Sequence, residues 1–287
     1  MSNRTVIYFF SGTGNTLFLA RELCRRIPDA TLVPIAALRD LRQVVPGCKT
    51  IGFCFPNHGG QLPTAMRKFV EKLKLAGDEY LFALVSSGGT GCNAFETINK
   101  VVKENAPRLR GEFLIQVPSF NPKTDDLSTL PSEHDIEEFR RTVPAKLDRI
   151  ADAVINEKTE TVSDAPPYRL PWIIAKLVPF VLRVVERFPS FQKAYFYADP
   201  SCTGCATCVR VCPTCRITVK DRTPTWDATV PCYFCHACLA FCPVGAVQVT
   251  PKLIWAGSKT TTNPRFTPPL AAIEEIARQR EETEYRC

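Results

Sequence analysis

The first part of the chain alternates between short apolar runs and stretches in which apolar residues recur every three or four positions. Continuous apolar runs predict strands buried on both faces at residues 5–10, 31–34, 50–55, 80–86 and 112–117. Helical spacing predicts helices at residues 17–27, 64–75, 93–105 and 135–155, the last interrupted or kinked near Pro144. Strands alternating with helices indicate an α/β fold with a five-stranded doubly wound parallel sheet over residues 1–157.

The pattern changes after residue 157. Residues 158–193 begin with a polar, proline-bearing linker and continue into an amphipathic helix at residues 170–189. Residues 194–250 are rich in cysteine and predict a second, smaller domain. The tail, residues 251–287, ends in an amphipathic sequence that predicts a surface helix.

The helix predicted at residues 170–189 has the length of a membrane span, but it carries four charged residues and has Pro179 in its middle. Charges at that density make a spanning position unfavourable. We expect this helix to pack against the two domains. A helix lying on a membrane surface, with Lys176 and Arg183 on its polar face, is a less favoured alternative, and a surface for docking a partner protein is a third.

Composition supports a folded protein of a reducing compartment. The 287 residues are 45% hydrophobic and 23% charged, which allows a packed core and excludes wholesale disorder. The apolar run at residues 6–10 is too short for the core of a signal peptide, and no small-residue cleavage site follows it, so we expect a cytoplasmic location. There the 14 cysteines are better read as metal ligands than as disulfides.

A loop of glycines and short polar side chains joins the first predicted strand to the first predicted helix. Its residues are Ser11, Gly12, Thr13, Gly14, Asn15 and Thr16. The loop contains no lysine, unlike the loops that bind nucleoside triphosphates. Neutral donors at the N-terminus of a helix suit a terminal phosphate monoester. An ordinary turn between strand and helix is the alternative reading.

Two further loops leave the carboxyl ends of the third and fourth predicted strands. In an open parallel sheet, ligands bind at this edge. The glycines of these loops let the backbone approach a flat ring closely. The candidate binding residues in the two loops are Pro56, Asn57, His58 and Gly59, and Ser87, Gly88, Gly89 and Gly91.

The arrangement of the three loops resembles that of flavodoxins. The resemblance covers the first domain and implies a flavodoxin-like fold with bound FMN, its phosphate in the loop at residues 11–16 and its ring between the other two loops. The sequence departs from flavodoxins in lacking their usual acidity. His58 also stands where many flavodoxins place an aromatic residue, so it either contacts the flavin or is an exposed loop histidine.

One cysteine spacing occurs twice. Cys-x-x-Cys-x-x-Cys-x-x-x-Cys-Pro spans residues 202–213 and again residues 232–243. This is the spacing of bacterial ferredoxins with two [4Fe–4S] clusters, in which the fourth cysteine of each run binds the other cluster. The first cluster is thus assigned to Cys202, Cys205, Cys208 and Cys242, and the second to Cys232, Cys235, Cys238 and Cys212. Zinc is the alternative, but the repeated cysteine–proline ending is unusual for zinc sites.

The whole chain resembles the flavodoxin–ferredoxin fusion proteins of anaerobic bacteria and archaea. The match includes residues 193–197 before the first cysteine run and residues 265–268 in the tail. The resemblance implies a small α+β ferredoxin domain, FMN and two [4Fe–4S] clusters as cofactors, and redox proteins as partners.

The predicted function is electron transfer between FMN and the two clusters, coupling two-electron and one-electron partners in anaerobic metabolism. A carrier is favoured over an enzyme. The alternatives are a flavin-dependent reductase of a quinone or another unsaturated compound, and an iron–sulfur redox sensor. The net charge of +7 falls to about +1 if each cluster and the FMN phosphate carry about −2, so it does not indicate nucleic-acid binding. The sequence does not indicate an oligomeric state.

Overall fold

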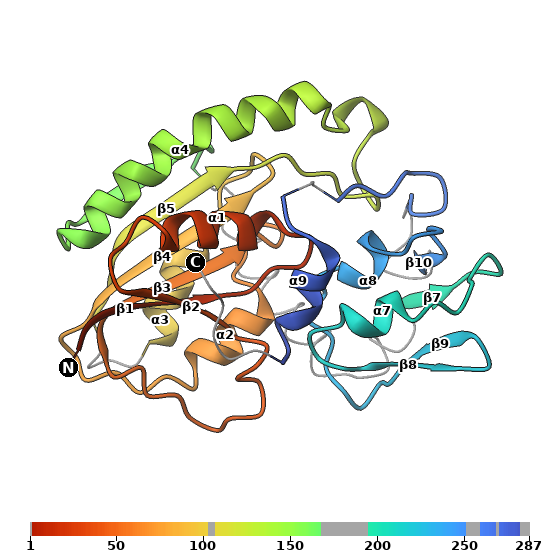
Figure 1. The fold of residues 1–287 in the computed structure, drawn as a ribbon, viewed down its shortest axis with the longest axis horizontal. Helices are drawn as coiled ribbons and strands as arrows, with labels where there is room; N and C mark the ends of the chain where they lie inside the picture. Colours follow the sequence, from red (N-terminus) through yellow and green to blue (C-terminus); the bar gives the residue numbers. More distant parts are fainter. Residues whose placement is uncertain (1, 103–106, 168–194, 251–258, 268–269, 282–287) are drawn as a thin grey trace, which may run out of the picture.

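A six-stranded parallel sheet forms the centre of the N-terminal domain (Figure 1). The computed structural model describes residues 2–102, 107–167, 195–250, 259–267 and 270–281. The strand order is β2-β1-β3-β4-β5-β6. The strands are β1 (Ser2–Phe9), β2 (Ala30–Pro34), β3 (Cys48–Pro56), β4 (Tyr80–Ser87), β5 (Leu109–Gln116) and β6 (Glu160–Ser163).

Helices cover both faces of this sheet. The helices of the domain are α1 (Asn15–Cys24), α2 (Thr64–Val70), α3 (Ala94–Val101) and α4 (Glu133–Ile155), with the short 3-10 helix η1 (Leu127–Thr129). Helices α1 and α4 bury apolar residues in one core cluster, and α2 and α3 bury theirs in another. A capping box between Ser132 and Asp135 starts α4, which continues through Pro144 without a break.

The sixth strand corrects the five-stranded prediction. Residues Glu160–Ser163 pair in parallel with residues 111–114 of β5 and lie in the segment that the sequence predicted to be a linker. They form an edge strand in which exposed and half-buried positions alternate, and Val162 packs against the core. The polarity of its outward positions hid the strand, because the continuous apolar runs used to find strands are typical only of those buried on both faces.

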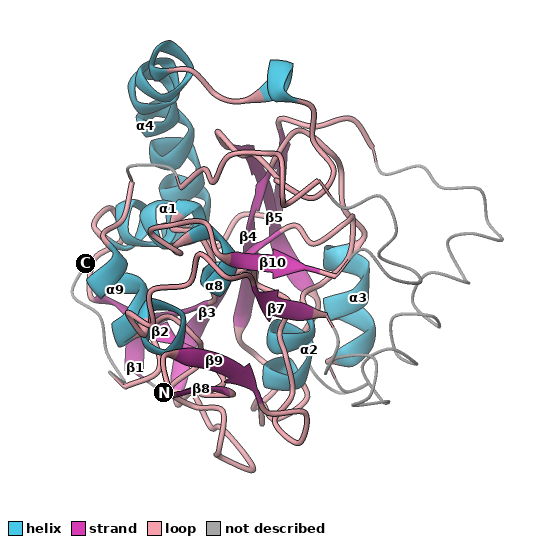
Figure 2. Ribbon diagram, turned by 90° about the vertical axis from the view of Figure 1, so that its right-hand side faces the viewer, coloured by secondary structure: helices cyan, strands magenta, loops and turns pink. Residues whose placement is uncertain are grey.

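The C-terminal domain contains two short antiparallel pairs. Strand β7 (Phe196–Ala198) pairs with β10 (Val247–Val249), and β8 (Ile217–Lys220) pairs with β9 (Thr223–Trp226). Two one-turn helices, α7 (Thr207–Arg210) and α8 (Ala237–Ala240), follow left-handed residues at equivalent places in the two cysteine runs, Ala206 and His236. Figure 2 views the molecule with this small domain in front of the sheet.

The tail packs against the N-terminal domain. Helix α9 (Ile273–Arg278) buries Ile276 in the same core cluster as α1, together with Leu270. The expected surface helix is therefore partly buried. The helix predicted at residues 170–189 lies outside the described residues, and none of the described helices is long and apolar enough to cross a membrane.

Substitution at Val162 tests whether β6 belongs to the sheet. Val162→Ser removes apolar burial and should lower the free energy of unfolding by about 1 kcal/mol. Thr161→Ser, at an exposed position of the same strand, is the matched control and should leave it unchanged. Denaturant titration of the two variants measures both values, and equal stabilities would argue that residues 160–163 are a linker.

Candidate functional site

The loop between β1 and α1 opens the N-terminus of α1 toward a ligand. Gly14 is the N-cap, with φ of 110°, a conformation that favours glycine. No side chain caps the helix and no acidic residue lies in its first turn. The Gly14 N–H donates to Ser11 Oγ at 3.2 Å, which shapes the loop. The free N-terminal end of α1 therefore favours an anion.

The three predicted loops meet around a cavity of about 330 Å³, here called the smaller cavity. Gly12, Thr13, Asn15 and Thr16 line it from the first loop, Pro56, Asn57 and His58 from the second, and Gly88 from the third. The volume falls within the range of small-molecule and cofactor sites. The edge of the sheet predicted to bind a ligand thus contains a pocket of suitable size.

The predicted binding residues that do not line this cavity lie beside it; they are Ser11, Gly14, Gly59, Ser87, Gly89 and Gly91. Asn57 Nδ2 ties the second loop to the third, donating to Ser87 Oγ at 3.1 Å and to the carbonyl oxygen of Gly91 at 3.2 Å. Gly89, with φ of 106°, packs near Gln116. Gly59 faces open space. Ser11 and Gly14 contact the tail, where the Ser11 N–H donates to Gln279 Oε1 at 3.1 Å.

The hydrogen bonding of Asn15 indicates which kind of ligand the smaller cavity can bind. Its Nδ2 donates to the carbonyl oxygen of Pro118 at 2.8 Å, whereas its Oδ1 is buried and has no hydrogen-bond partner in the described structure. A buried acceptor without a donor is unfavourable. A ligand with hydroxyl groups next to its anionic end would supply that donor, and the ribityl phosphate of FMN has both.

His58 is half-buried in the cavity wall, so the reading of it as an exposed loop histidine is wrong. Burial, reinforced by the positive charge of Lys123, lowers the pKa of His58 to about 4. The side chain is therefore neutral near pH 7 and can offer one donor and one acceptor. Its ring lies edge-on to that of Phe10, with the centroids 6.4 Å apart.

The C-terminal half of the chain completes the smaller cavity. Cys235, His236, Leu239, Ala240 and Phe266 line it opposite the three loops. The loop after β5 also contributes a series of residues, Val117, Ser119, Phe120, Asn121, Pro122 and Asp125. The sequence analysis did not identify these residues as parts of the cavity.

The eight predicted ligand cysteines gather in two groups. Cys202, Cys205, Cys208 and Cys242, here called the first quartet, line one small hollow. Cys212, Cys232, Cys235 and Cys238, the second quartet, line another. Each hollow thus receives three cysteines from one run and the fourth from the other run. Among the described residues, no three His, Cys, Asp or Glu side chains are arranged to hold a single metal ion.

Each quartet holds a thiol whose burial opposes ionisation. Burial raises the pKa of Cys208 to about 11, and the nearby sulfurs of Cys242, Cys202 and Cys205 also raise it. Burial raises the pKa of Cys238 well above its usual value, with further increases from Cys235, Cys232 and Cys212. Four clustered thiolates are therefore stable only beside strong positive charge, which bound iron would provide.

Comparison with known proteins agrees with this two-part architecture. Residues 201–247 match the 4Fe-4S dicluster domain family. In the N-terminal domain, the strand order of β2-β1-β3-β4-β5 is that of flavodoxins, with β6 added at the edge. The chain is thus a fusion of an α/β domain that has the flavodoxin strand order with a 4Fe-4S dicluster domain.

Two solved structures are similar to about half of this chain. The flavodoxin of Megasphaera elsdenii is 16% identical, with a TM-score of 0.36 over 53% of this chain and 98% of its own. An FMN-dependent NADH-azoreductase from Bacillus anthracis is 10% identical, with a TM-score of 0.31 over 54% of this chain and 100% of its own. No curated protein sequence matches the fusion.

The two domains of the fusion are in contact at the loop between β1 and α1, residues 11–16. A side-chain carbon at Gly12 would lie well inside van der Waals contact with the carbonyl oxygen of Cys235, a member of the second quartet. Only glycine leaves room for this approach. The second quartet is therefore packed directly against the wall of the smaller cavity.

A partly buried chain of hydrogen bonds also joins the domains. Lys123 Nζ, on the loop after β5, donates to Tyr195 Oη at 2.9 Å, and Tyr195 Oη lies 2.9 Å from His236 Nε2. Burial lowers the pKa of Lys123 to about 8 and the pKa of His236 well below its usual value. With His236 neutral, the geometry fits Tyr195 donating to its Nε2. This chain of hydrogen bonds fixes the loop of the second quartet beside the cavity.

Substitution of Gly12 tests the contact between the domains. Gly12→Ala should push the Cys235 loop away, lowering the Tm and speeding the loss of iron from the second quartet in air. Lys68→Ala, at an exposed position of α2, is the control and should leave both properties unchanged. Differential scanning calorimetry and timed iron release measure both effects. Equal behaviour of the two variants would contradict the contact.

Proposed function

We propose that this fusion is an electron-transfer protein that passes electrons between FMN in the smaller cavity and two [4Fe–4S] clusters held by the two quartets. The contact between Gly12 and Cys235 is the observation that carries the proposal, because it sets one quartet against the cavity wall. When bound, FMN exchanges one or two electrons and each cluster exchanges one, so the three groups together couple pairwise and single-electron partners.

Each part of the smaller cavity has a task in this proposal. The N-terminus of α1 and the hydroxyl groups of Thr13 and Thr16 would hold the phosphate. The buried Oδ1 of Asn15 would accept from a ribityl hydroxyl. Neutral His58 and the backbone near Gly88, which line the same cavity, would offer hydrogen bonds to the ring without adding charge.

The two quartets differ in solvent exposure, and this difference indicates which of them exchanges electrons with a partner protein. Cys205 of the first quartet is exposed, and the exposed apolar side chain of Val244 lines the same hollow. The second quartet has no exposed member. A redox partner protein therefore docks at the first quartet, and the second quartet connects it to the flavin. We infer the same reducing, cytoplasmic setting as from the sequence, because all eight thiols must remain free to bind iron.

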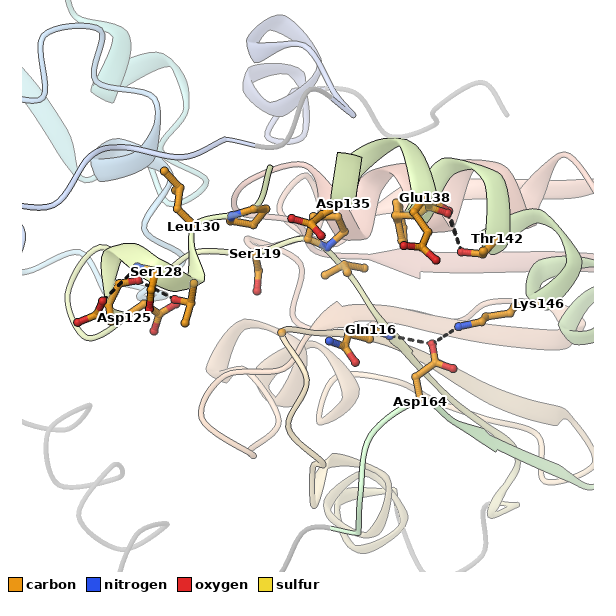
Figure 3. A pocket seen from close by; sticks show the side chains of 17 residues that line it. Gln116, Ser119, Asp125, Ser128, Leu130, Asp135, Glu138, Thr142, Lys146 and Asp164 are labelled. Atoms are coloured by element: carbon orange, nitrogen blue, oxygen red, sulfur yellow. Dashed lines mark hydrogen bonds and ion pairs between the residues drawn. The ribbon is translucent and has the colours of Figure 1, made fainter. Parts of the chain in front are cut away.

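A second candidate function, a reductase of an organic substrate, is favoured by one observation. A larger cavity of about 950 Å³ adjoins the smaller one, and Gly88, Val117, Ser119 and Asp125 line both. Figure 3 shows its polar wall, with the ion pair between Lys146 and Asp164 at 2.7 Å. A compound held there would lie next to the flavin site. The carboxylates of Asp135 and Glu138 would favour a polar or cationic substrate.

Cofactor content tests the main proposal. The full chain, purified without oxygen and with iron and flavin supplied, should contain about eight irons and one FMN. Asn15→Asp should lose FMN and keep iron, because a carboxylate there repels both the carbonyl oxygen of Pro118 and the phosphate. Zinc in place of iron, or flavin-free wild-type protein, would refute the assignment.

The pairing of cysteines with clusters is testable separately. Cys212→Ser should remove the same electron paramagnetic resonance signal as Cys235→Ser, and Cys242→Ser the same signal as Cys205→Ser. Cys215→Ser is the matched control, since this exposed thiol follows Cys212 but does not line either hollow, and it should leave both signals intact. If Cys212→Ser removes the signal of Cys205 instead, the crossed pairing is wrong.

Filling the larger cavity separates the two candidate functions. Thr142 lines only this cavity, so Thr142→Trp should leave electron transfer from the reduced protein to a one-electron protein acceptor unchanged. For a carrier, the rate of reduction of a small quinone is also unchanged. A several-fold fall in the quinone rate alone would favour the reductase. Stopped-flow absorbance measures both rates.

A further inference from the structure

The bulkiest of the fully buried side chains in the described structure belongs to an arginine. Arg216 is 1% exposed and lines the hollow of the second quartet, with Phe196 and Trp226 as aromatic neighbours. Burial of a guanidinium is unfavourable unless nearby groups compensate for the loss of water. Its position within the hollow therefore requires a physical reason.

The internal repeat shows that the fold does not need an arginine at this position. Arg216 follows Cys212 by four residues, and the residue in the same place after Cys242 is Ala246, which is fully buried. The backbone of the two turns is alike, with φ of 56° at Cys215 and 66° at Gly245. The turn thus forms equally with a methyl group, and only the second quartet receives a buried charge.

The guanidinium lies in the same hollow as the sulfurs of the second quartet. Arg216 lines this hollow together with Cys212, Cys232, Cys235 and Cys238. Asp227 is the nearby carboxylate: its N–H donates to the carbonyl oxygen of Arg216 at 2.8 Å, and its side chain is exposed and accepts from Thr229. Solvent therefore screens Asp227 much more than it screens Arg216.

The first quartet has a different kind of cationic neighbour. Burial lowers the pKa of Arg265, and the nearby Cys242 and Asp199 oppose this shift. Its guanidinium is only half-buried and donates to the carbonyl oxygens of Thr260, Gly245 and Val247 and to Gln248 Oε1. These oxygens take up its donors and offset its charge. The two quartets therefore have unequal electrostatic surroundings.

We propose that Arg216 raises the reduction potential of the cluster in the second quartet above that of the cluster in the first. Reduction adds one electron to a cluster, and a fixed positive charge in a region of low dielectric stabilises the added negative charge. An electron accepted at the exposed first quartet then resides on the cluster beside the smaller cavity. This inference rests on the proposed function, because it needs both quartets to hold iron.

A redox titration of the full chain without oxygen, followed by electron paramagnetic resonance, tests the inference. The wild-type protein should show two clusters with different potentials, and the Cys235→Ser variant should lack the higher one. Arg216→Gln should shift that potential to a more negative value and leave the other unchanged. Arg265→Gln is the control and should leave the potential of the second quartet in place.

The outcomes distinguish this inference from the proposed function. Wild-type protein without about eight irons would refute the proposed function itself. Two wild-type clusters with the higher potential in the first quartet would overturn the role of Arg216 without any variant. Unchanged potentials in an iron-replete Arg216→Gln protein would do the same. If that variant loses iron, Arg216→Lys retains the charge and should keep the order of the potentials, and a reversed order would overturn the inference.

Discussion

The close approach of the Gly12 backbone to the carbonyl of Cys235 is the constraint on which the rest of the structure depends. It requires a residue without a side chain at the start of α1 and a tight cysteine loop in the second domain. The tail reinforces it, since Gln279 exchanges two hydrogen bonds with the backbone of Ser11. Because the backbone at Gly12 meets the Cys235 carbonyl without a side chain between them, the loop of Cys235 forms part of the wall of the smaller cavity.

Electrostatics explains how the clustered thiols can be accommodated. Burial and neighbouring sulfurs raise the pKa of Cys208 in the first quartet and of Cys238 in the second, so these thiols favour the neutral form without metal. Iron binding reverses this preference, which links assembly of the clusters to the stability of the C-terminal domain. The domain has few other stabilising elements, since its strands are only three or four residues long.

The surroundings of the two quartets differ in solvent exposure and in charge. The first quartet includes an exposed cysteine, whereas the second is enclosed and contains the guanidinium of Arg216. The chain of hydrogen bonds from Lys123 through Tyr195 to His236 fixes the enclosed quartet against the cavity. The two copies of an internal sequence repeat thereby have different environments, one partly exposed to solvent and one enclosed against the smaller cavity.

The sequence by itself determined the local chemistry. The cysteine spacing, the hydroxyl-rich loop at residues 11–16 and the apolar runs of five strands predicted most of the fold and the lining of the cavity from the first domain, because each depends on neighbours a few residues apart. Only the tertiary structure decided that Glu160–Ser163 joins the sheet, that Cys235 and His236 cover the cavity, and that Arg216 is buried beside Cys232. These features arise from packing between segments far apart in the chain, and an edge strand or a buried arginine has no periodic pattern to reveal it.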